Sequence, residues 1–399
     1  MQVALGAVYA WSVFRIPLTK AHGWTISEVT FAFELTIFVL GFAAFAGGIW
    51  MRRSGPRPVA FTSAVLYGAG TALAGMANSL AGLYLSYGVV AGIGLGFGYI
   101  VPIATLVKWF PDKRGMITGL AVAGFGAGAL VTAPAANWLI FHVGLASTFQ
   151  TLGLAYLVVV FTCAFWMRNP QTTTATAGYA AKKRAAAPQQ QFSLKQALGT
   201  WQWYALWLTL FLNTTAGISI ISQAAPMAQE MTGVTAAVAA GLVGLISIAN
   251  GSGRFLWAWF SDAVGRRTVF LVMFLLQAGV FLLLGHCHEF ATLSLLACLV
   301  LLCYGGGFGT MPAFATDYFG DREIGSVYGL MLTAWGFAAM FGPMLVARVR
   351  EATGHYSGAL SLLAATMLVS AVVPLLLRRP GEPRVQVGTL ADEASRASI

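Results

Sequence analysis

The chain has 399 residues, of which 58% are hydrophobic and 9% charged, and its net charge is +10. Ordinary soluble domains are about 45–50% apolar and about 25% charged, so this composition excludes a soluble protein and predicts an integral membrane protein. The excess positive charge does not indicate nucleic-acid binding, because the basic residues lie dispersed between hydrophobic runs instead of forming one patch.

Twelve hydrophobic runs approach or exceed the ~20 residues that a helix needs to cross a bilayer. In chain order they cover residues 1–19, 27–50, 58–78, 81–107, 115–141, 146–167, 200–224, 234–261, 268–285, 290–316, 324–347 and 357–377. The first run starts at Met1 and meets Arg15 after fourteen residues, so this helix is expected to be short or to lack its beginning. The sequence predicts an all-α integral membrane fold of twelve transmembrane helices, without a cleavable signal peptide.

The lysines and arginines predict the orientation of the chain in the membrane. Of the 23, 18 fall in segments on the same side as the N-terminus, four fall on the opposite side, and the last is Arg254. Because basic residues concentrate in cytoplasmic segments, both termini are predicted to be cytoplasmic and the protein to lie in the cell membrane. Two termini on one side require an even number of helices, which agrees with twelve.

The chain is predicted to consist of two related halves. Residues 1–167 and 200–378 each form a six-helix bundle, joined by a basic cytoplasmic linker at 168–199 and followed by a cytoplasmic tail at 379–399. Gly96-Phe-Gly98 and Pro102 in the first half correspond to Gly307-Phe-Gly309 and Pro312 in the second, at offsets of 211 and 210 residues. A duplicated six-helix unit is typical of transporters whose halves rock about a site near the membrane midplane.

Arg254 is a charged residue in the interior of a predicted transmembrane helix. Seven uncharged residues separate it from Asp262, which places it roughly 12 Å inside the segment at about 1.5 Å per residue. A charge at that depth is costly and calls for an anionic partner. Asn250 lies one turn earlier on the same face and cannot be ionised, so it leaves Arg254 free to bind an external anion. A structural arginine that donates to backbone carbonyls is the alternative.

Several motifs carry a resemblance to a known family. The turns Gly48-x3-Arg52-Arg-x-Gly55-Pro-Arg57 and Ala258-x3-Asp262-Ala-x-Gly265-Arg-Arg267 resemble, with imperfections in both copies, the hallmark turn of the major facilitator superfamily. Within it, the chain resembles the oxalate/formate antiporter family and related monocarboxylate porters through Trp109-Phe-Pro-Asp-Lys-Arg-Gly115, Asn250-Gly-x-x-Arg254 and Thr316-Asp-Tyr-Phe-Gly320. The resemblance implies a major facilitator fold with two pseudo-symmetric six-helix bundles.

The same resemblance implies a substrate site around Arg254, which would neutralise a substrate carboxylate with Asn250 beside it. Its aromatic cage would consist of five residues on four helices, Tyr9, Tyr99, Phe125, Tyr304 and Phe308. Where oxalate carriers have a second cation, this chain has Trp335. A dianion would keep one charge uncompensated beside a single cation. The expected substrate is therefore a short monocarboxylate such as formate, lactate or pyruvate, although each aromatic residue has helix packing as its alternative role.

Four charged residues are expected to form a cytoplasmic gate: Asp262, Arg266, Asp112 and Arg114. The resemblance implies that Asp262 contacts the N-terminus of a neighbouring helix, where the helix dipole favours a carboxylate. Arg52 occupies the equivalent place in the first half, where the family has an acid. An arginine cannot cap the positive end of a helix. The corresponding contact in the first half is therefore expected to be missing or reorganised.

Glu34 is a candidate proton carrier. It lies near the start of the second predicted helix, inside an apolar stretch. Burial favours the neutral form of a carboxyl group, so Glu34 could take up a proton during transport. Pairing with Arg15, or hydration at the membrane surface, is the alternative.

The sequence predicts neither cofactor nor metal, and no enzyme activity. The stretch from His286 to Glu289 is expected to be a solvated loop without a second cluster of ligands, and Gly92 to Gly98 lie within a hydrophobic helix rather than a nucleotide-binding turn. We expect a monomeric transporter of a small carboxylate in the lipid bilayer, acting as a uniporter, proton symporter or anion exchanger. The alternatives are an oxalate/formate-type exchanger, an exporter of another class of small molecule, and a non-transporting sensor on the same scaffold.

Overall fold

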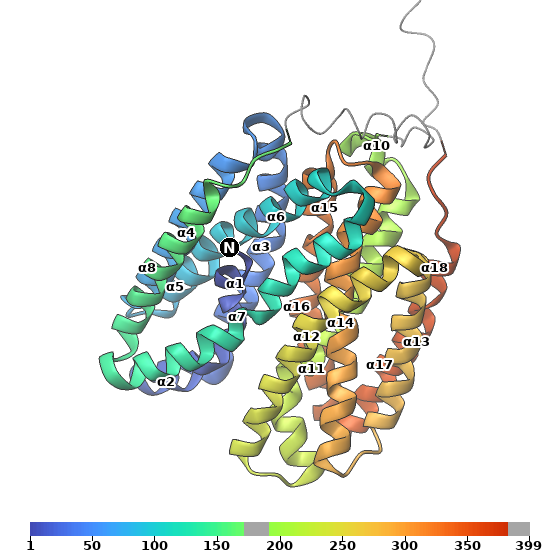
Figure 1. Ribbon diagram of the computed structural model, residues 1–399. Coiled ribbons are helices and arrows are strands. Elements are labelled where there is room, and N and C mark those ends of the chain that lie inside the picture. Colours follow the sequence, from blue (N-terminus) through green and yellow to red (C-terminus); the bar gives the residue numbers. More distant parts are fainter. Residues whose placement is uncertain (171–190, 382–399) are drawn as a thin grey trace, which may run out of the picture.

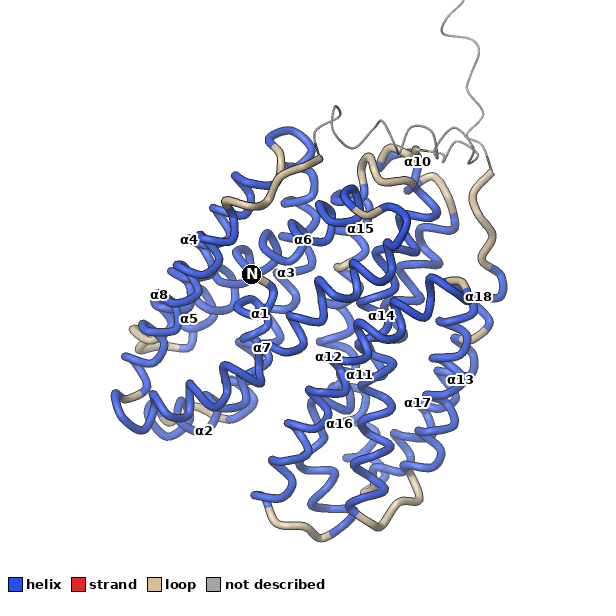
Figure 2. The backbone as a smooth tube through the Cα atoms, in the orientation of Figure 1, coloured by secondary structure: helices blue, strands red, loops and turns tan. Residues whose placement is uncertain are grey.

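A computed structural model describes residues 1–170 and 191–381, and every regular element in these ranges is a helix (Figure 2). The first half contains α1 (Gln2–Leu5), η1 (Gly6–Trp11), α2 (Ser12–His22), α3 (Ile26–Ser54), α4 (Pro56–Ala74), α5 (Leu80–Leu83), η2 (Tyr84–Ala91), α6 (Gly92–Trp109), η3 (Pro111–Lys113), α7 (Arg114–Val143) and α8 (Leu145–Ala164). The second contains α10 (Leu194–Leu198), α11 (Trp201–Thr232), α12 (Ala236–Val264), α13 (Arg266–Leu284), α14 (Phe290–Phe319), α15 (Ile324–Met331), α16 (Thr333–Thr353), α17 (Tyr356–Ser370) and α18 (Val372–Leu376).

The predicted all-helical membrane fold is confirmed. Nine helices of the described ranges are long and apolar enough to cross a membrane. The other three predicted spans are the stretch from α1 to α2, α4 and α12, and each is helical over much the same residues as predicted. The first of these is interrupted by the 3-10 turn η1, and the fourth span contains the π-helical η2 between α5 and α6.

Two helices continue well beyond the hydrophobic runs that predict them. The span predicted at 200–224 runs to Thr232, and the span predicted at 324–347 runs to Thr353. Both stop at a glycine with positive φ, 68° at Gly233 and 78° at Gly354, a conformation that other residues rarely adopt. Hydrophobicity locates the membrane segment, whereas these glycines locate the end of the helix.

The helices form two bundles, α1 to α8 and α11 to α18 (Figure 1). We call the end next to α10 the linker side; the bundles meet there and diverge towards the opposite side. Across their interface α3 packs against α15 and α16, and α12 packs against α7. In each pair the second span of one half contacts the fifth span of the other, which is the two-fold relation that the internal repeat predicts.

The predicted linker, 168–199, is described only at 168–170 and 191–199, and the predicted tail, 379–399, only as far as 381; their remaining residues lie outside the described ranges. The end of the linker is docked onto the second bundle. Phe192 is buried, its ring centroid lies 5.6 Å from that of Phe319, and its backbone N–H donates to the Phe319 carbonyl at 2.9 Å. Ser193 and Gln196 then form a capping box that starts α10.

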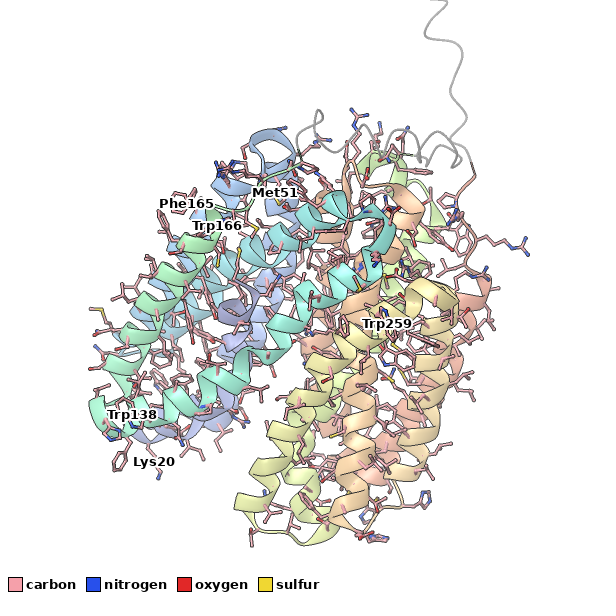
Figure 3. All side chains as sticks on the ribbon, in the orientation of Figure 1. Lys20, Met51, Trp138, Phe165, Trp166 and Trp259 are labelled. Carbon is pink, nitrogen blue, oxygen red and sulfur yellow. The ribbon has the colours of Figure 1, made fainter. Side chains whose placement is uncertain are left out.

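Exposed aromatic side chains mark both ends of the first bundle (Figure 3). Phe165 and Trp166 lie on the linker side, whereas Trp138 and Lys20 lie at the opposite end. Trp166 is 72% exposed and Trp138 59% exposed. Tryptophan is enriched where protein meets the membrane–water boundary, so these residues fit the two edges of a membrane-embedded bundle.

Candidate functional site

Close helix packing fixes the backbone of Arg254 at the centre of the molecule. A Cβ on Gly309 of α14 would lie 1.9 Å from the Arg254 carbonyl oxygen, and one on Gly119 of α7 would lie 2.6 Å from the same atom. Real side chains cannot approach that closely, so α7 and α14 can hold this turn of α12 between them only because both positions are glycine.

The Arg254 guanidinium is fully buried, with 0% exposure. Its Nε donates to Asn250 Oδ1 at 3.3 Å, its Nη1 to the Val122 carbonyl at 3.4 Å, and its Nη2 to the Tyr9 hydroxyl at 3.1 Å. All three acceptors are neutral, and no carboxylate of the described ranges forms an ion pair with Arg254. These three bonds use three of the five donors of a guanidinium.

Aromatic rings surround the buried cation. The Arg254 Cζ lies 5.0 Å from the ring centroid of Phe308, 5.3 Å from that of Phe125 and 6.0 Å from that of Tyr9. Rings at such distances attract a cation through their negative faces. They do not neutralise its charge, and they exclude water from it.

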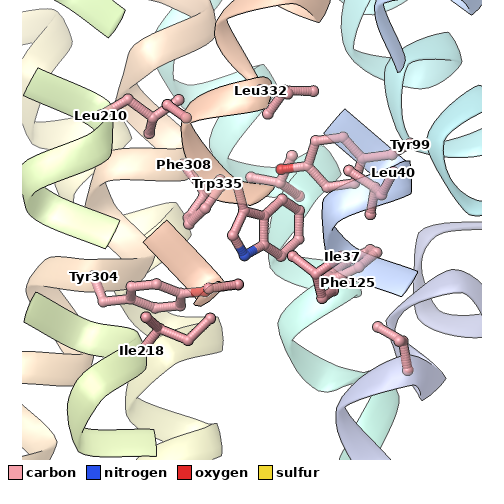
Figure 4. Close-up of a cluster of buried hydrophobic side chains, with 14 of the residues drawn as sticks. Ile37, Leu40, Tyr99, Phe125, Leu210, Ile218, Tyr304, Phe308, Leu332 and Trp335 are labelled. Carbon is pink, nitrogen blue, oxygen red and sulfur yellow. The ribbon is translucent and has the colours of Figure 1, made fainter. Parts of the chain in front are cut away.

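Trp335 contacts the same three rings as Arg254. Its ring centroid lies 4.6 Å from Phe308, 5.8 Å from Phe125 and 6.3 Å from Tyr9, and 5.6 Å from Tyr99 (Figure 4). Its indole N–H has no hydrogen-bond partner among the described residues. The aromatic cluster is therefore bounded by a cation contributed by α12 and by an uncharged donor contributed by α16.

The structure brings all eight residues of the predicted substrate site together: Arg254, Asn250, Tyr9, Tyr99, Phe125, Tyr304, Phe308 and Trp335. Tyr9 lies in the 3-10 turn η1 and is partly exposed, whereas the other rings are fully buried. Its hydroxyl lies 3.3 Å from that of Tyr304, which links the first bundle to the second.

Tyr328 belongs to the same cluster, but sequence reasoning did not single it out. Its side chain is fully buried, and its hydroxyl interacts electrostatically with Tyr99 and Arg254. It lies seven residues before Trp335, about two helical turns, so the two side chains share one face. This spacing from Trp335 is the feature of the sequence that could have identified Tyr328 as a residue of the site.

Glu34 is not part of this cluster. It is half-buried on α3, towards the side opposite the linker, and its electrostatic partner is Arg15 of α2. The electrostatic partners of Arg254 are instead four tyrosines of the cluster: Tyr9, Tyr99, Tyr304 and Tyr328.

Glu34→Gln is expected to leave the dependence of transport on a pH gradient intact, because its electrostatic partner is Arg15 and not Arg254. Uptake into proteoliposomes with and without an imposed gradient measures this. Glu28→Gln, at the exposed start of the same helix, is the control. A selective loss of the gradient dependence in Glu34→Gln would instead identify Glu34 as the proton carrier.

On the linker side, Asp262 at the end of α12 reaches across to the first bundle. Its carboxylate accepts from the backbone N–H groups of Gly115 at 3.1 Å and Met116 at 2.8 Å, in the first turn of α7. Arg266 holds the same carboxylate from its own bundle at 2.5 Å. A carboxylate at a helix N-terminus is stabilised by the unpaired N–H groups and the helix dipole.

Asp317 extends this contact into a network. It pairs with Arg266 at 3.1 Å in its own bundle and with Arg114 at 3.6 Å in the other. Arg114 also lies 3.5 Å from Asp321. Asp112 lies exposed in η3, two residues before Arg114. Sequence reasoning had noted Asp317 only as part of a motif, because its role depends on the approach of α7.

Comparison with known proteins agrees with this architecture. The model of the Major Facilitator Superfamily matches residues 2–258 and 214–398. The chain belongs to the Major Facilitator Superfamily. It is 27% identical to the oxalate:formate antiporter of Oxalobacter formigenes, with 97% of this chain and 91% of the relative covered. It is 26% identical to monocarboxylate transporter 13 of Rattus norvegicus, with 94% and 86% covered.

Solved structures of the superfamily share the fold. FucP, the fucose:proton symporter of E. coli, matches in its outward conformation with a TM-score of 0.71 and 16% sequence identity. The match covers 95% of this chain and 98% of the FucP chain. The family match and the related transporters show that this protein is a multi-pass membrane transporter of the superfamily.

Arg52, which takes the place of Asp262 in the first half, also contacts the other bundle, but with the charges exchanged. Arg52 at the end of α3 donates to Glu323 Oε1 at 2.6 Å, directly before α15 begins. The other oxygen of Glu323 accepts from the Leu194 backbone N–H at 3.0 Å, at the start of α10. The first half thus supplies the cation and the second half the carboxylate, and the docked linker shares the same carboxylate.

This pair predicts a charge-reversal rescue. Arg52→Glu and Glu323→Arg are each expected to lower the thermal stability of the purified protein, and the double variant is expected to recover about 1 kcal/mol of coupling, discounted because Arg52 is 47% exposed. Arg53→Glu, at the exposed neighbouring position, is the control. Strictly additive losses in the double variant would show that Arg52 and Glu323 are not coupled.

Proposed function

We propose that this protein transports a short monocarboxylate, such as formate, lactate or pyruvate, by alternating access. The observation that carries the proposal is Arg254, a fully buried cation whose hydrogen-bond partners are all neutral. A buried charge without a counter-charge is costly, about 3–5 kcal/mol in cases where one partner of a buried pair is removed. A carboxylate on the substrate would supply the counter-charge through two charge-assisted bonds.

The shell around Arg254 supports a substrate of small size and single charge. Phe125, Phe308 and Trp335 enclose the cation with apolar surface and leave no second cation beside it in the described structure. A second carboxylate in this low-dielectric space would remain uncompensated. The names of the related oxalate:formate antiporter and monocarboxylate transporter support a carboxylate as the substrate class.

Exchange of oxalate for formate is the second candidate. It is favoured by the 27% identity to the oxalate:formate antiporter over 97% of this chain. It requires the site to accept a dianion, and the uncharged Trp335 beside a single cation argues against that. A monoanion such as formate is consistent both with the similarity to this antiporter and with the single positive charge of the site.

The mechanism follows from the two-bundle arrangement. Arg254 and Trp335 of the second bundle enclose the site together with Tyr9, Tyr99 and Phe125 of the first. Closing both bundles around a neutralised ion pair costs less free energy than closing them around a bare cation. Substrate binding therefore enables the change between the outward-facing and inward-facing states.

The linker side is proposed to face the cytoplasm, in keeping with its excess of basic residues. There Asp262, Arg266 and Arg114 with Asp317, together with the Arg52–Glu323 pair, would hold the cytoplasmic gate closed. Opening towards the cytoplasm requires these contacts between bundles to separate while contacts on the opposite side form.

Uptake by the purified protein in proteoliposomes tests the proposal. We expect saturable uptake of radiolabelled formate, lactate or pyruvate, with inhibition by unlabelled monocarboxylates and none by oxalate. Uptake of none of these carboxylates, together with uptake of an uncharged or cationic solute, would contradict it.

A further inference from the structure

Two buried tyrosine hydroxyls beside Arg254 lie near each other but make no hydrogen bond of ordinary length and angle. Tyr99 of α6 and Tyr328 of α15 are both fully buried, and neither hydroxyl has a hydrogen-bond partner among the described residues. A buried polar group that makes no hydrogen bond is costly and rare, and each instance needs an explanation. These residues come from different bundles, so the two hydroxyls approach each other only when the bundles close.

The two hydroxyls lie close to each other and to the guanidinium. Tyr328 interacts electrostatically with Tyr99 and with Arg254, and Tyr99 interacts with Arg254 in turn. The ring of Tyr99 packs against Phe125 at 5.1 Å and Trp335 at 5.6 Å, two walls of the Arg254 site. Figure 4 shows the Tyr99 hydroxyl directed towards Trp335.

We infer that Tyr99 and Tyr328 form a second, uncharged subsite, which binds a neutral oxygen of the substrate while Arg254 binds its carboxylate. A tyrosine hydroxyl both donates and accepts, so the pair can bind a hydroxyl or a carbonyl oxygen. Because the hydroxyls lie next to the guanidinium, that oxygen belongs on the carbon adjacent to the carboxylate. The preferred substrates are therefore 2-hydroxy and 2-oxo monocarboxylates, and Tyr328 is a specificity-determining residue.

The inference rests on the proposed function, since Arg254 must bind the carboxylate for the second oxygen to reach the tyrosines. It adds a discrimination that one cation cannot provide. Propionate, lactate and pyruvate share a three-carbon skeleton and one negative charge, and they differ only in the group at the second carbon. A site that forms hydrogen bonds to the oxygen at this carbon leaves its own hydroxyls without a hydrogen bond when propionate binds.

Calorimetric titration of the purified protein with these three acids tests the subsite. The wild-type protein is expected to bind lactate and pyruvate about three- to tenfold more tightly than propionate, the range for a neutral hydrogen bond. Tyr328→Phe and Tyr99→Phe should each reduce this preference, and the double variant should abolish it by lowering the affinity for lactate and pyruvate more than the affinity for propionate.

Tyr67→Phe is the matched control, because the Tyr67 hydroxyl is buried in the first bundle and donates to the Leu5 carbonyl, away from this site. Its preference should equal that of the wild type. Equal wild-type affinities for the three acids, a preference retained in the double variant, or an equal loss for all three acids in that variant would overturn the inference. If no acid, propionate included, binds the wild-type protein, the proposed function itself fails.

Discussion

Arg254→Gln is expected to abolish the response of the protein to carboxylates. The wild-type protein should gain about 2.7 kcal/mol of stability at a ligand concentration one hundred times Kd, seen as a rise in melting temperature. The glutamine keeps a polar side chain at the site but provides no positive charge, so it removes the charge-assisted bonds on which binding depends. The expected loss of affinity is at least about one hundredfold, because a buried charge pair contributes roughly 3 kcal/mol or more once broken.

A second arginine controls for the loss of charge alone. Arg350 forms an exposed ion pair with Glu230 near the ends of α16 and α11, at the side opposite the linker. Arg350→Gln should therefore keep the full carboxylate-induced shift in melting temperature. A retained shift in Arg254→Gln would remove Arg254 from the substrate site.

Trp335→Lys is expected to extend the site to dicarboxylates. The new ammonium group would lie among the rings of Tyr9, Phe125 and Phe308, which Trp335 shares with Arg254. Two cations would then face each other across the aromatic cluster, one for each carboxylate of oxalate. We expect oxalate to stabilise this variant against thermal unfolding, with an affinity gain of tenfold or more, since close charge pairs contribute about 1.5 kcal/mol upwards.

Trp335→Met separates the added charge from the lost indole. Methionine has an unbranched side chain like that of lysine, so both variants lose similar packing, and both are expected to melt at lower temperatures than the wild type. Only the lysine variant should respond to oxalate. An oxalate response of equal size in Trp335→Met would show that bulk, and not charge, excludes the dianion.

Much of the fold could be predicted because membrane segments are long and their composition is distinctive. The end of α11 could not, since Thr232 lies beyond the apolar run and the helix stops only where Gly233 adopts a positive φ. The interruption of the first span by η1 was also missed. Its apolar sequence is compatible with a regular helix. Gly6, where η1 begins, lies so close to α7 that a Cβ there would come within 1.9 Å of the Phe125 carbonyl oxygen, a tertiary contact that the sequence pattern does not reveal.

The candidate site could be predicted where a single residue violates the pattern around it. Arg254 is such a residue, because nothing in an apolar helix accounts for a charge. Tyr328 and Glu323 are different, since a tyrosine in a transmembrane segment and a glutamate in a loop are both ordinary. Their significance comes from their partners, Tyr99 and Arg52, which lie in the other bundle and more than two hundred residues away.

The central claim is that a single buried cation in an aromatic shell selects a short monocarboxylate. Thermal stabilisation of the purified wild-type protein by C1 to C4 mono- and dicarboxylates tests it most directly. Our account predicts concentration-dependent stabilisation by short monocarboxylates and none by oxalate or longer dicarboxylates. Stabilisation by oxalate without any by formate, lactate or pyruvate would contradict it.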